Sequence, residues 1–508
     1  MHKSLFRKPA SLAFAGADLI YLFCTFHRYW RAEENSERLY FSHLFFLGVL
    51  AAGLVFAFLK RKQIYQNIRL FFLSPEPAVN LAVFRVVICA TVFFSVNFKQ
   101  LSDLTALSPQ LLVAPPGLSW SVPYLVESFP FFNTGIRLLQ LTALLGVLGI
   151  FARPSIAAMS LLAVWIFGLP NFYGKVFHEH QCLIWFGLIL AGSACADALS
   201  LDKLWRKGER KAPHVKYGLP IKASWLVFGM IYFFPGFWKA YYVGLDWIFG
   251  DHLLLRMYRQ WFFLGDGKYP FFRIDLHPAL FTASAAAVLV FELTFCIFLF
   301  GRRTRNIFAA GGFLFHAVNA AYILYPFYQL RACYAVFVNW GAILHPNGAA
   351  QPASANELCA QKSCIAACSL VLAATFAAGS LNFISWPFSA YPHFADRYER
   401  LIEFPRLVAL DKQGNQIDIR PAVREISSAI NYVRWINRCE KRLLSPDNKV
   451  VAEELAGIWS ELKKRGGNFS QIARLQVFSM TFSTLPTANP ENRAIPLAQI
   501  FRYEIRVN

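Results

Sequence analysis

The sequence predicts an all-α polytopic membrane bundle followed by a small C-terminal α+β domain. Of its 508 residues, 56% are hydrophobic and 17% are aromatic, whereas only 16% are charged. Apolar runs of roughly 17–25 residues, the length that spans a bilayer, recur over most of the chain. From about residue 391 the composition changes to the mixed-charge pattern of an ordinary globular domain. We therefore divide the chain into N-terminal membrane helices (1–76), a transmembrane domain (77–390) and a tail domain (391–508).

Eleven apolar runs are predicted to be membrane-spanning helices. They cover 11–29, 40–59, 80–98, 136–151, 155–171, 180–198, 223–242, 281–301, 306–324, 328–346 and 364–387. The start of the chain resembles a secretion signal in outline. However, Asp18 interrupts its apolar stretch and no small-x-small cleavage site follows, so we expect a retained first helix.

The formal net charge of +20 does not indicate a nucleic-acid partner. Much of it lies in short basic runs beside apolar segments, at 60–62, 206–222 and 302–305. The positive-inside rule places such runs in the cytoplasm. We therefore expect a multi-pass protein of the plasma (inner) membrane with a cytoplasmic N-terminus. The loops 99–135, 172–179 and 243–280 and the whole tail are then extracytoplasmic.

The tail shows the alternation of paired strands and the periodicity of helices. Residues 406–410 and 416–419 are predicted to form a hairpin with Gly414 in its turn. Helices are predicted over 422–444 and 450–465, and further strands over 474–484 and 498–507. No protein partner of this tail can be named from the sequence.

Lys239 is the first candidate for a functional residue, because it lies inside an otherwise apolar run, where burying a charge is costly. An ionisable residue at the bilayer centre costs about 2.5–3.5 kcal/mol and is kept mainly where it faces a cavity and performs a task. Pro235 is expected to kink the helix one turn earlier and to open space for a ligand. The alternative is a lysine that extends to the lipid headgroups. Trp238, Tyr242 and Trp247 are candidates for contact with an apolar cofactor, or for an aromatic belt at the interface.

His180 is expected to lie at the same depth as Lys239. The two residues are about eighteen and sixteen positions from the cytoplasmic ends of their helices, which corresponds to roughly 27 and 24 Å of rise. Both then approach the outer leaflet. A metal site in His178-Glu179-His180 is disfavoured, because residues two apart on a helix point in opposite directions, so we predict no metal.

Glu292 and His316 are predicted to form an intramembrane polar pair. Each lies roughly 15–16 Å of helical rise from the basic turn 302–305 that joins their helices. At matched depth a carboxylate and an imidazole can neutralise each other or share a proton. The alternative is a clamp between helices without chemistry.

Several short segments, in this order, resemble the horizontally transferred transmembrane (HTTM) family, which includes vitamin K-dependent gamma-glutamyl carboxylase. The segments are Leu81-Ala-Val-Phe-Arg85, Glu179-His180-Gln-Cys-Leu183, Gly236-Phe-Trp-Lys239 with Asp246-Trp247, Phe291-Glu292 with Arg302-Arg303 and His316, and Trp386-Pro-Phe-Ser-Ala-Tyr-Pro392.

The resemblance implies a carboxylase- or epoxidase-like lyase that uses reduced vitamin K or a related quinol on the extracytoplasmic side. It implies that Lys239 deprotonates the hydroquinone and that His180 orients or stabilises the resulting anion. The chain departs from the carboxylase where Trp238 stands in place of a second lysine, and its tail shows no match to the peptide-binding part. Two other functions remain open: a non-catalytic protein that binds lipid or assembles a membrane complex, and a proton-coupled transporter.

Overall fold

The computed structural model describes residues 36–205, 212–261, 270–344, 362–390, 400–484 and 496–507. The predicted first helix, 11–29, lies outside the described residues.

Seven helices in the described part are long and apolar enough to cross a membrane. They are α2 (Ser36–Leu59), α4 (Ala78–Ser95), α7 (Phe132–Leu148), α8 (Ala152–Ile166), α11 (Val215–Tyr242), α14 (Pro278–Phe298) and α18 (Lys362–Ser380). Each corresponds to a predicted span, so the helical, membrane-compatible character of this region is confirmed.

Three predicted spans differ from the structure. Segment 180–198 contains only the short helix α9 (Gln181–Gly192). Segment 306–324 lies in α15 (Arg302–Tyr322), but α15 is not one of the seven membrane-compatible helices because polar residues lower its hydropathy. Segment 328–346 is not one helix, and this prediction was wrong. It forms α16 (Tyr328–Cys333), the 3-10 turn η7 (Tyr334–Phe337) and α17 (Trp340–Leu344).

Shorter elements connect the long helices. They are α3 (Arg61–Leu73), α5 (Phe98–Ala106), η1 (Pro109–Leu111), η2 (Ser119–Ser121), α6 (Val122–Glu127), η3 (Phe129–Phe131), η4 (Leu169–Phe172), α10 (Leu201–Trp205), α12 (Asp246–Phe249), α13 (His252–Arg259) and η6 (Ile274–Leu276). Among the long helices, α11 is central, because it packs against α2, α3, α4, α9, α14 and α18.

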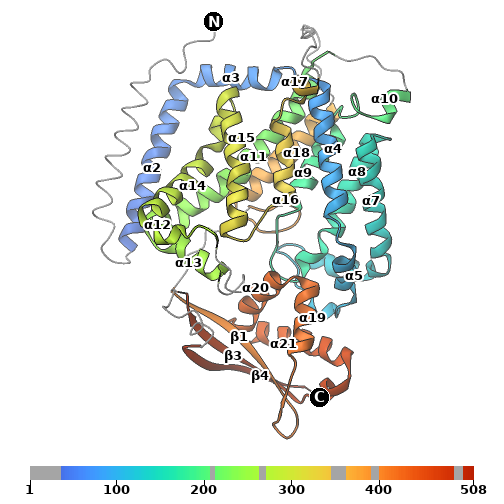
Figure 1. Cartoon of the computed structure of the whole chain (residues 1–508), viewed down its shortest axis with the longest axis vertical. Coiled ribbons are helices and arrows are strands. Elements are labelled where there is room, and N and C mark those ends of the chain that lie inside the picture. The colour runs from blue at the N-terminus through green and yellow to red at the C-terminus, as the bar shows by residue number, and fades with distance from the viewer. Residues whose placement is uncertain are drawn as a thin grey trace.

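The two ends of the helical bundle differ in what they carry. Figure 1 shows α3, α10 and α17 at one end, and α5, α13 and the tail at the other. The basic start of α3 therefore lies at the end away from the tail. The loops 99–135 and 243–280, which contain α5 and α13, lie at the same end as the tail, as the charge pattern predicts.

The tail contains a four-stranded antiparallel sheet in the order β2-β1-β3-β4. Its strands are β1 (Leu401–Leu410), β2 (Gln416–Ile417), β3 (Arg474–Ser483) and β4 (Ala498–Arg506). The predicted hairpin is confirmed, since Leu410 pairs with Gln416 and Gly414 adopts a φ of 92° that favours glycine. The strands predicted at 474–484 and 498–507 are also confirmed.

Three helices accompany this sheet: α19 (Arg420–Ile430), α20 (Tyr432–Leu443) and α21 (Asn448–Arg465). The single helix predicted over 422–444 is broken at Asn431, which has a φ of 87°. The Asn431 side chain accepts hydrogen bonds from the backbone N–H groups of Val433 and Arg434, and it therefore caps the start of α20. The break turns α20 toward the bundle.

Buried polar contacts attach the tail to the bundle. Arg438 is 2% exposed; it forms an ion pair with Glu454 and donates to the carbonyl oxygen of Leu111 in the 99–135 loop. The Glu461 carboxylate accepts the backbone N–H of Ser108 at 2.7 Å. The tail and this loop thus share one buried interface.

Candidate functional site

Lys239 forms an ion pair with Glu292 in the interior of the bundle. The Lys239 Nζ lies 2.5 and 2.6 Å from the two carboxylate oxygens of Glu292. The exposed fractions of the two side chains are 2% and 5%. The Lys239 Nζ also lies 4.9 Å from the centre of the Trp247 ring, within cation–π range. Lys239 therefore does not extend to the headgroups, which was the alternative interpretation.

Two glycines on α11 bring α14 close enough for this pair to form. A Cβ added at Gly236 would lie 2.8 Å from the Glu292 Cβ, and one at Gly229 would lie 2.5 Å from the Cys296 sulfur. The glycines are seven residues apart, which is two helical turns, so they share one face of α11. Small residues at such an interface let two helix backbones approach closely.

His316 contacts tyrosines, and Glu292 takes Lys239 as its partner. His316 Nε2 lies 2.7 Å from the Tyr232 hydroxyl, which also contacts the Tyr334 hydroxyl. On α14, the neighbouring residue Phe291 faces α15, where it stacks on Phe308. Glu292, about 100° further round the helix, faces α11. In the structure, Glu292 is thus paired with Lys239 and His316 with Tyr232, instead of with each other as predicted.

His180 lies in a different place from Lys239. It lines a cavity of about 110 Å³ between the bundle and the tail. Its ring stacks on Phe167 with the ring centres 4.2 Å apart. Lys239 lines neither this cavity nor a larger one in the tail. The expected meeting of Lys239 and His180 is therefore not a feature of the structure.

An aromatic layer separates these two groups of polar residues. The His316 ring lies 4.9 Å from the Phe327 ring, measured between centres. Phe327 stacks in turn on His178 at 5.9 Å, and His178 is two residues from His180. The Nδ1 atom of His316 is buried and has no hydrogen-bond partner among the residues that the structure describes.

The polar cavity at His180 holds charged groups from both parts of the protein. The Tyr325 hydroxyl donates to the Glu179 carboxylate, and Arg434 of the tail donates to the Asn171 side chain at 3.2 Å. Burial and, to a smaller extent, the nearby Arg434 lower the pKa of His180 to about 4. His180 is consequently neutral at pH 7 and can accept a hydrogen bond.

The same burial acts on the charged neighbours of His180. It raises the pKa of Glu179, an effect that Arg434 opposes. It lowers the pKa of Arg434 to about 10, an effect that Glu179 opposes. The two charges therefore depend on each other inside this cavity.

The three aromatic candidates do not form one surface. Trp238 Nε1 donates to the carbonyl oxygen of Gly379 at 2.8 Å, and the Asn382 side chain donates to the Tyr242 hydroxyl at 3.0 Å. Both rings thus face α18 and the turn that follows it. Trp247 lies against Lys239, and in the described part of the chain its buried Nε1 has no hydrogen-bond partner.

Within the described residues, no group of three or more His, Cys, Asp or Glu side chains is arranged to hold a metal ion.

Two participants were missed at the sequence level. Arg434 reaches the His180 cavity from the tail, and no spacing along the chain indicates that contact. Tyr232 lies seven residues before Lys239 and shares its helix face, so helical periodicity was an available signal.

Comparison with known proteins adds no relative to this picture. No protein-family model, no curated protein and no solved structure shows significant similarity to the chain.

Proposed function

We propose that this protein is a membrane enzyme in which Lys239 and Glu292 handle a proton for a lipid-soluble quinol, reduced vitamin K or a relative. The observation that carries the proposal is the buried ion pair between two membrane-compatible helices. An ionisable pair in such a position is a functional-site hypothesis by default. The carboxylase- or epoxidase-like character rests on the resemblance to the HTTM family.

The pair fits a quinol in two respects. The Trp247 ring lies beside Lys239, and its buried indole Nε1 has no hydrogen-bond partner among the described residues, so this N–H can donate to an oxygen of a bound molecule. The Trp247 ring is 1% exposed, and it could stack on the ring of a quinol once the side chains that now cover it move aside. When bound, the quinol would supply an acidic hydroxyl and the reducing electrons.

The chemistry of the pair follows from its charges. The Glu292 carboxylate accepts a proton from the hydroxyl, and the Lys239 ammonium stabilises the oxyanion that remains. The net charge of the site does not change, which avoids the cost of creating an unpaired charge in an apolar interior. In this proposal Glu292, and not His180, is the partner of Lys239.

We further propose that the protein lies in the inner membrane, with the basic end of the bundle in the cytoplasm and the tail outside. Support comes from α3, which begins with Arg61 and Lys62 and lies at the end of the bundle opposite the tail.

The test uses full-length protein in nanodiscs, with reduced vitamin K, dioxygen and bicarbonate. Lys239→Met and Glu292→Gln are each expected to slow the loss of reduced vitamin K about 100-fold or more, the usual contribution of general acid–base catalysis. Lys362→Met, on the exposed first turn of α18, is the matched control. Unchanged turnover in Lys239→Met would contradict the proposal.

A non-catalytic role is the second candidate, because Lys239 and Glu292 satisfy each other and could serve only to join α11 to α14. The double variant Lys239→Met/Glu292→Leu separates the two functions. If the pair is only structural, this variant keeps whatever turnover or ligand binding the wild type has.

A further inference from the structure

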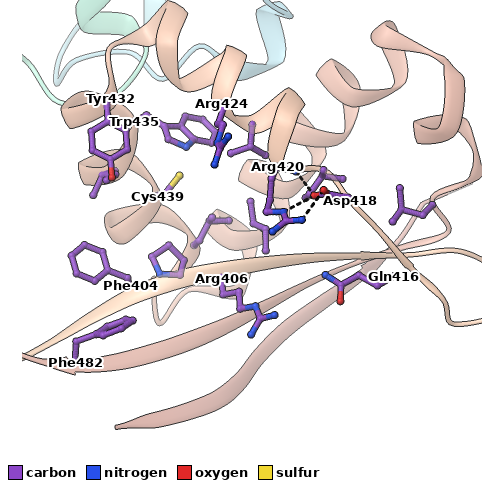
Figure 2. Close-up of a pocket in the computed structure, with 17 residues that line it drawn as sticks. Phe404, Arg406, Gln416, Asp418, Arg420, Arg424, Tyr432, Trp435, Cys439 and Phe482 are labelled. Atoms are coloured by element: carbon purple, nitrogen blue, oxygen red, sulfur yellow. Dashed lines mark hydrogen bonds and ion pairs between the residues drawn. The ribbon is translucent and has the colours of Figure 1, made fainter. Parts of the chain in front are cut away.

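A cavity of the tail lies between the sheet and the helices α19 and α20. It has a volume of about 840 Å³, within the range of roughly 300–1,000 Å³ that small-molecule sites occupy. Figure 2 shows Trp435 and Cys439 of α20 above the cavity and Phe404 and Phe482 of the sheet below it. Neither the ion pair at Lys239 nor the His180 cavity belongs to it.

The interior of this cavity is apolar. Trp435, Cys439 and Leu443 are 5%, 7% and 1% exposed. Ile436 and Val423 add further aliphatic surface. Contact with a hydrocarbon chain would remove the exposed part of Ile436 and Val423 from water, at about 25 cal/mol for each Å².

The rim of the cavity is positively charged. Its charged residues are three exposed arginines, Arg406, Arg420 and Arg424, and one carboxylate, Asp418. Asp418 forms a two-pronged ion pair with Arg420, with N–O distances of 2.8 Å. Arg406 and Arg424 form no ion pair within the described residues, so two positive charges remain to meet an anion.

The adjacent strand edge is unsuited to a peptide. In the described part of the chain, β2 pairs only with Ala409 and Leu410 of β1, which leaves the rest of that edge open. Pro405 lies in the open part and has no N–H to donate to an added strand. A peptide that extends the sheet is therefore disfavoured compared with a ligand that needs no backbone ladder.

We propose that this cavity binds a single-chain amphiphile with an anionic head, such as a long-chain fatty acid. The chain would lie along Trp435, Ile436 and Leu443, and the carboxylate would meet Arg406 and Arg424. Arginine recognises carboxylates through paired, charge-assisted hydrogen bonds. The site is independent of the proposed quinol chemistry.

The test uses full-length protein in phosphatidylcholine nanodiscs and a photoreactive C18 fatty acid with the diazirine in its chain. Mass spectrometry is expected to find labelled peptides from β1 and α20. Oleate is expected to suppress this labelling, and uncharged methyl oleate is not. Equal suppression by both would overturn the assignment of an anionic head.

Two exposed arginines provide the matched variants. Arg406→Gln/Arg424→Gln is expected to weaken labelling about tenfold, equivalent to about 1.4 kcal/mol. The control Lys412→Gln/Lys449→Gln removes two exposed cations of the same domain that do not line the cavity, and it is expected to label like the wild type. Equal labelling in both double variants would refute the proposal. Labelling spread over the membrane helices, or displacement by an apolar peptide but not by oleate, would also refute it.

Discussion

Gly236 lies against Glu292 so closely that a methyl group at position 236 would come within 2.8 Å of the Glu292 Cβ. Lys239 follows less than one helical turn later and reaches the same carboxylate. The ion pair therefore depends on a residue that carries no charge and makes no hydrogen bond with its side chain.

Gly236→Ala is expected to destabilise the protein by about 1–3 kcal/mol, the typical cost of overpacking a tight contact. Thermal unfolding in detergent measures the effect. Gly48→Ala on α2 is the control, because nothing lies within 4 Å of a Cβ added there. Equal melting temperatures for the two variants would mean that α11 and α14 can move apart to accept the added methyl group without loss of stability.

The Lys239–Glu292 pair is expected to show strong thermodynamic coupling. Lys239→Met or Glu292→Leu alone leaves one buried charge unpaired and should cost about 3–5 kcal/mol. The double variant should recover most of this loss, because it buries two apolar side chains of similar volume. A double-mutant cycle of unfolding free energies gives the coupling. Simple additivity of the single effects would argue against a buried pair.

Arg438→Met is expected to loosen the tail from the bundle, because it leaves Glu454 and the Leu111 carbonyl with fewer partners inside a buried interface. Limited proteolysis should then release the tail faster than in the wild type. Arg502→Met is the comparison: its ion pair with Glu403 is 43% exposed on both sides. Such surface pairs contribute only about 0–1 kcal/mol. Equal cleavage rates for the two variants would contradict this role of Arg438.

His180 is expected to make the stability of the protein depend on pH. Its pKa is lowered from 6.5 to about 4 in the folded state, so between these values the unfolded chain binds more protons. The free energy of unfolding should therefore fall as the pH is lowered from 6.5 to 4. His180→Gln should remove this contribution, so that the free energy of unfolding of the variant depends less steeply on pH between 4 and 6.5. Identical slopes in the two proteins would show that His180 titrates normally.

The proposed topology predicts opposite labelling of two engineered cysteines. Lys412→Cys in the tail should react with a membrane-impermeant maleimide in intact spheroplasts. Lys62→Cys on α3 should react only after permeabilisation. Both positions are exposed, and the wild-type chain gives the background from native cysteines. The reverse pattern would invert the orientation.

Residue spacing along the helices did not indicate the directions in which the polar side chains point. Counting residues from the turn at 302–305 placed Glu292 and His316 at similar heights. It could not tell that Glu292 faces α11 while Phe291 faces α15. Direction depends on which small residues let helices approach, here Gly229 and Gly236, and a single sequence does not indicate which glycines do so.

The tail was predicted more fully, because its strands and turns have local signals. Gly414 marked the hairpin, and alternation marked β3 and β4. The break at Asn431 was missed because apolar periodicity continues across it from α19 to α20. The prediction of one helix over 328–346 was wrong because it relied on the high average hydrophobicity of the segment, which does not show that the segment is divided into three short elements.

The guanidinium of Arg434, in the tail, donates a hydrogen bond to Asn171 of the bundle. Arg434 also lines the same cavity as His180. The membrane helices and the tail are consequently matched to each other, and neither can be replaced freely by the corresponding part of another protein. A chimera that joins these membrane helices to a foreign tail would need an arginine in the matching place. Without that arginine, Glu179 would lose its nearby positive charge and Asn171 would lose a hydrogen-bond donor.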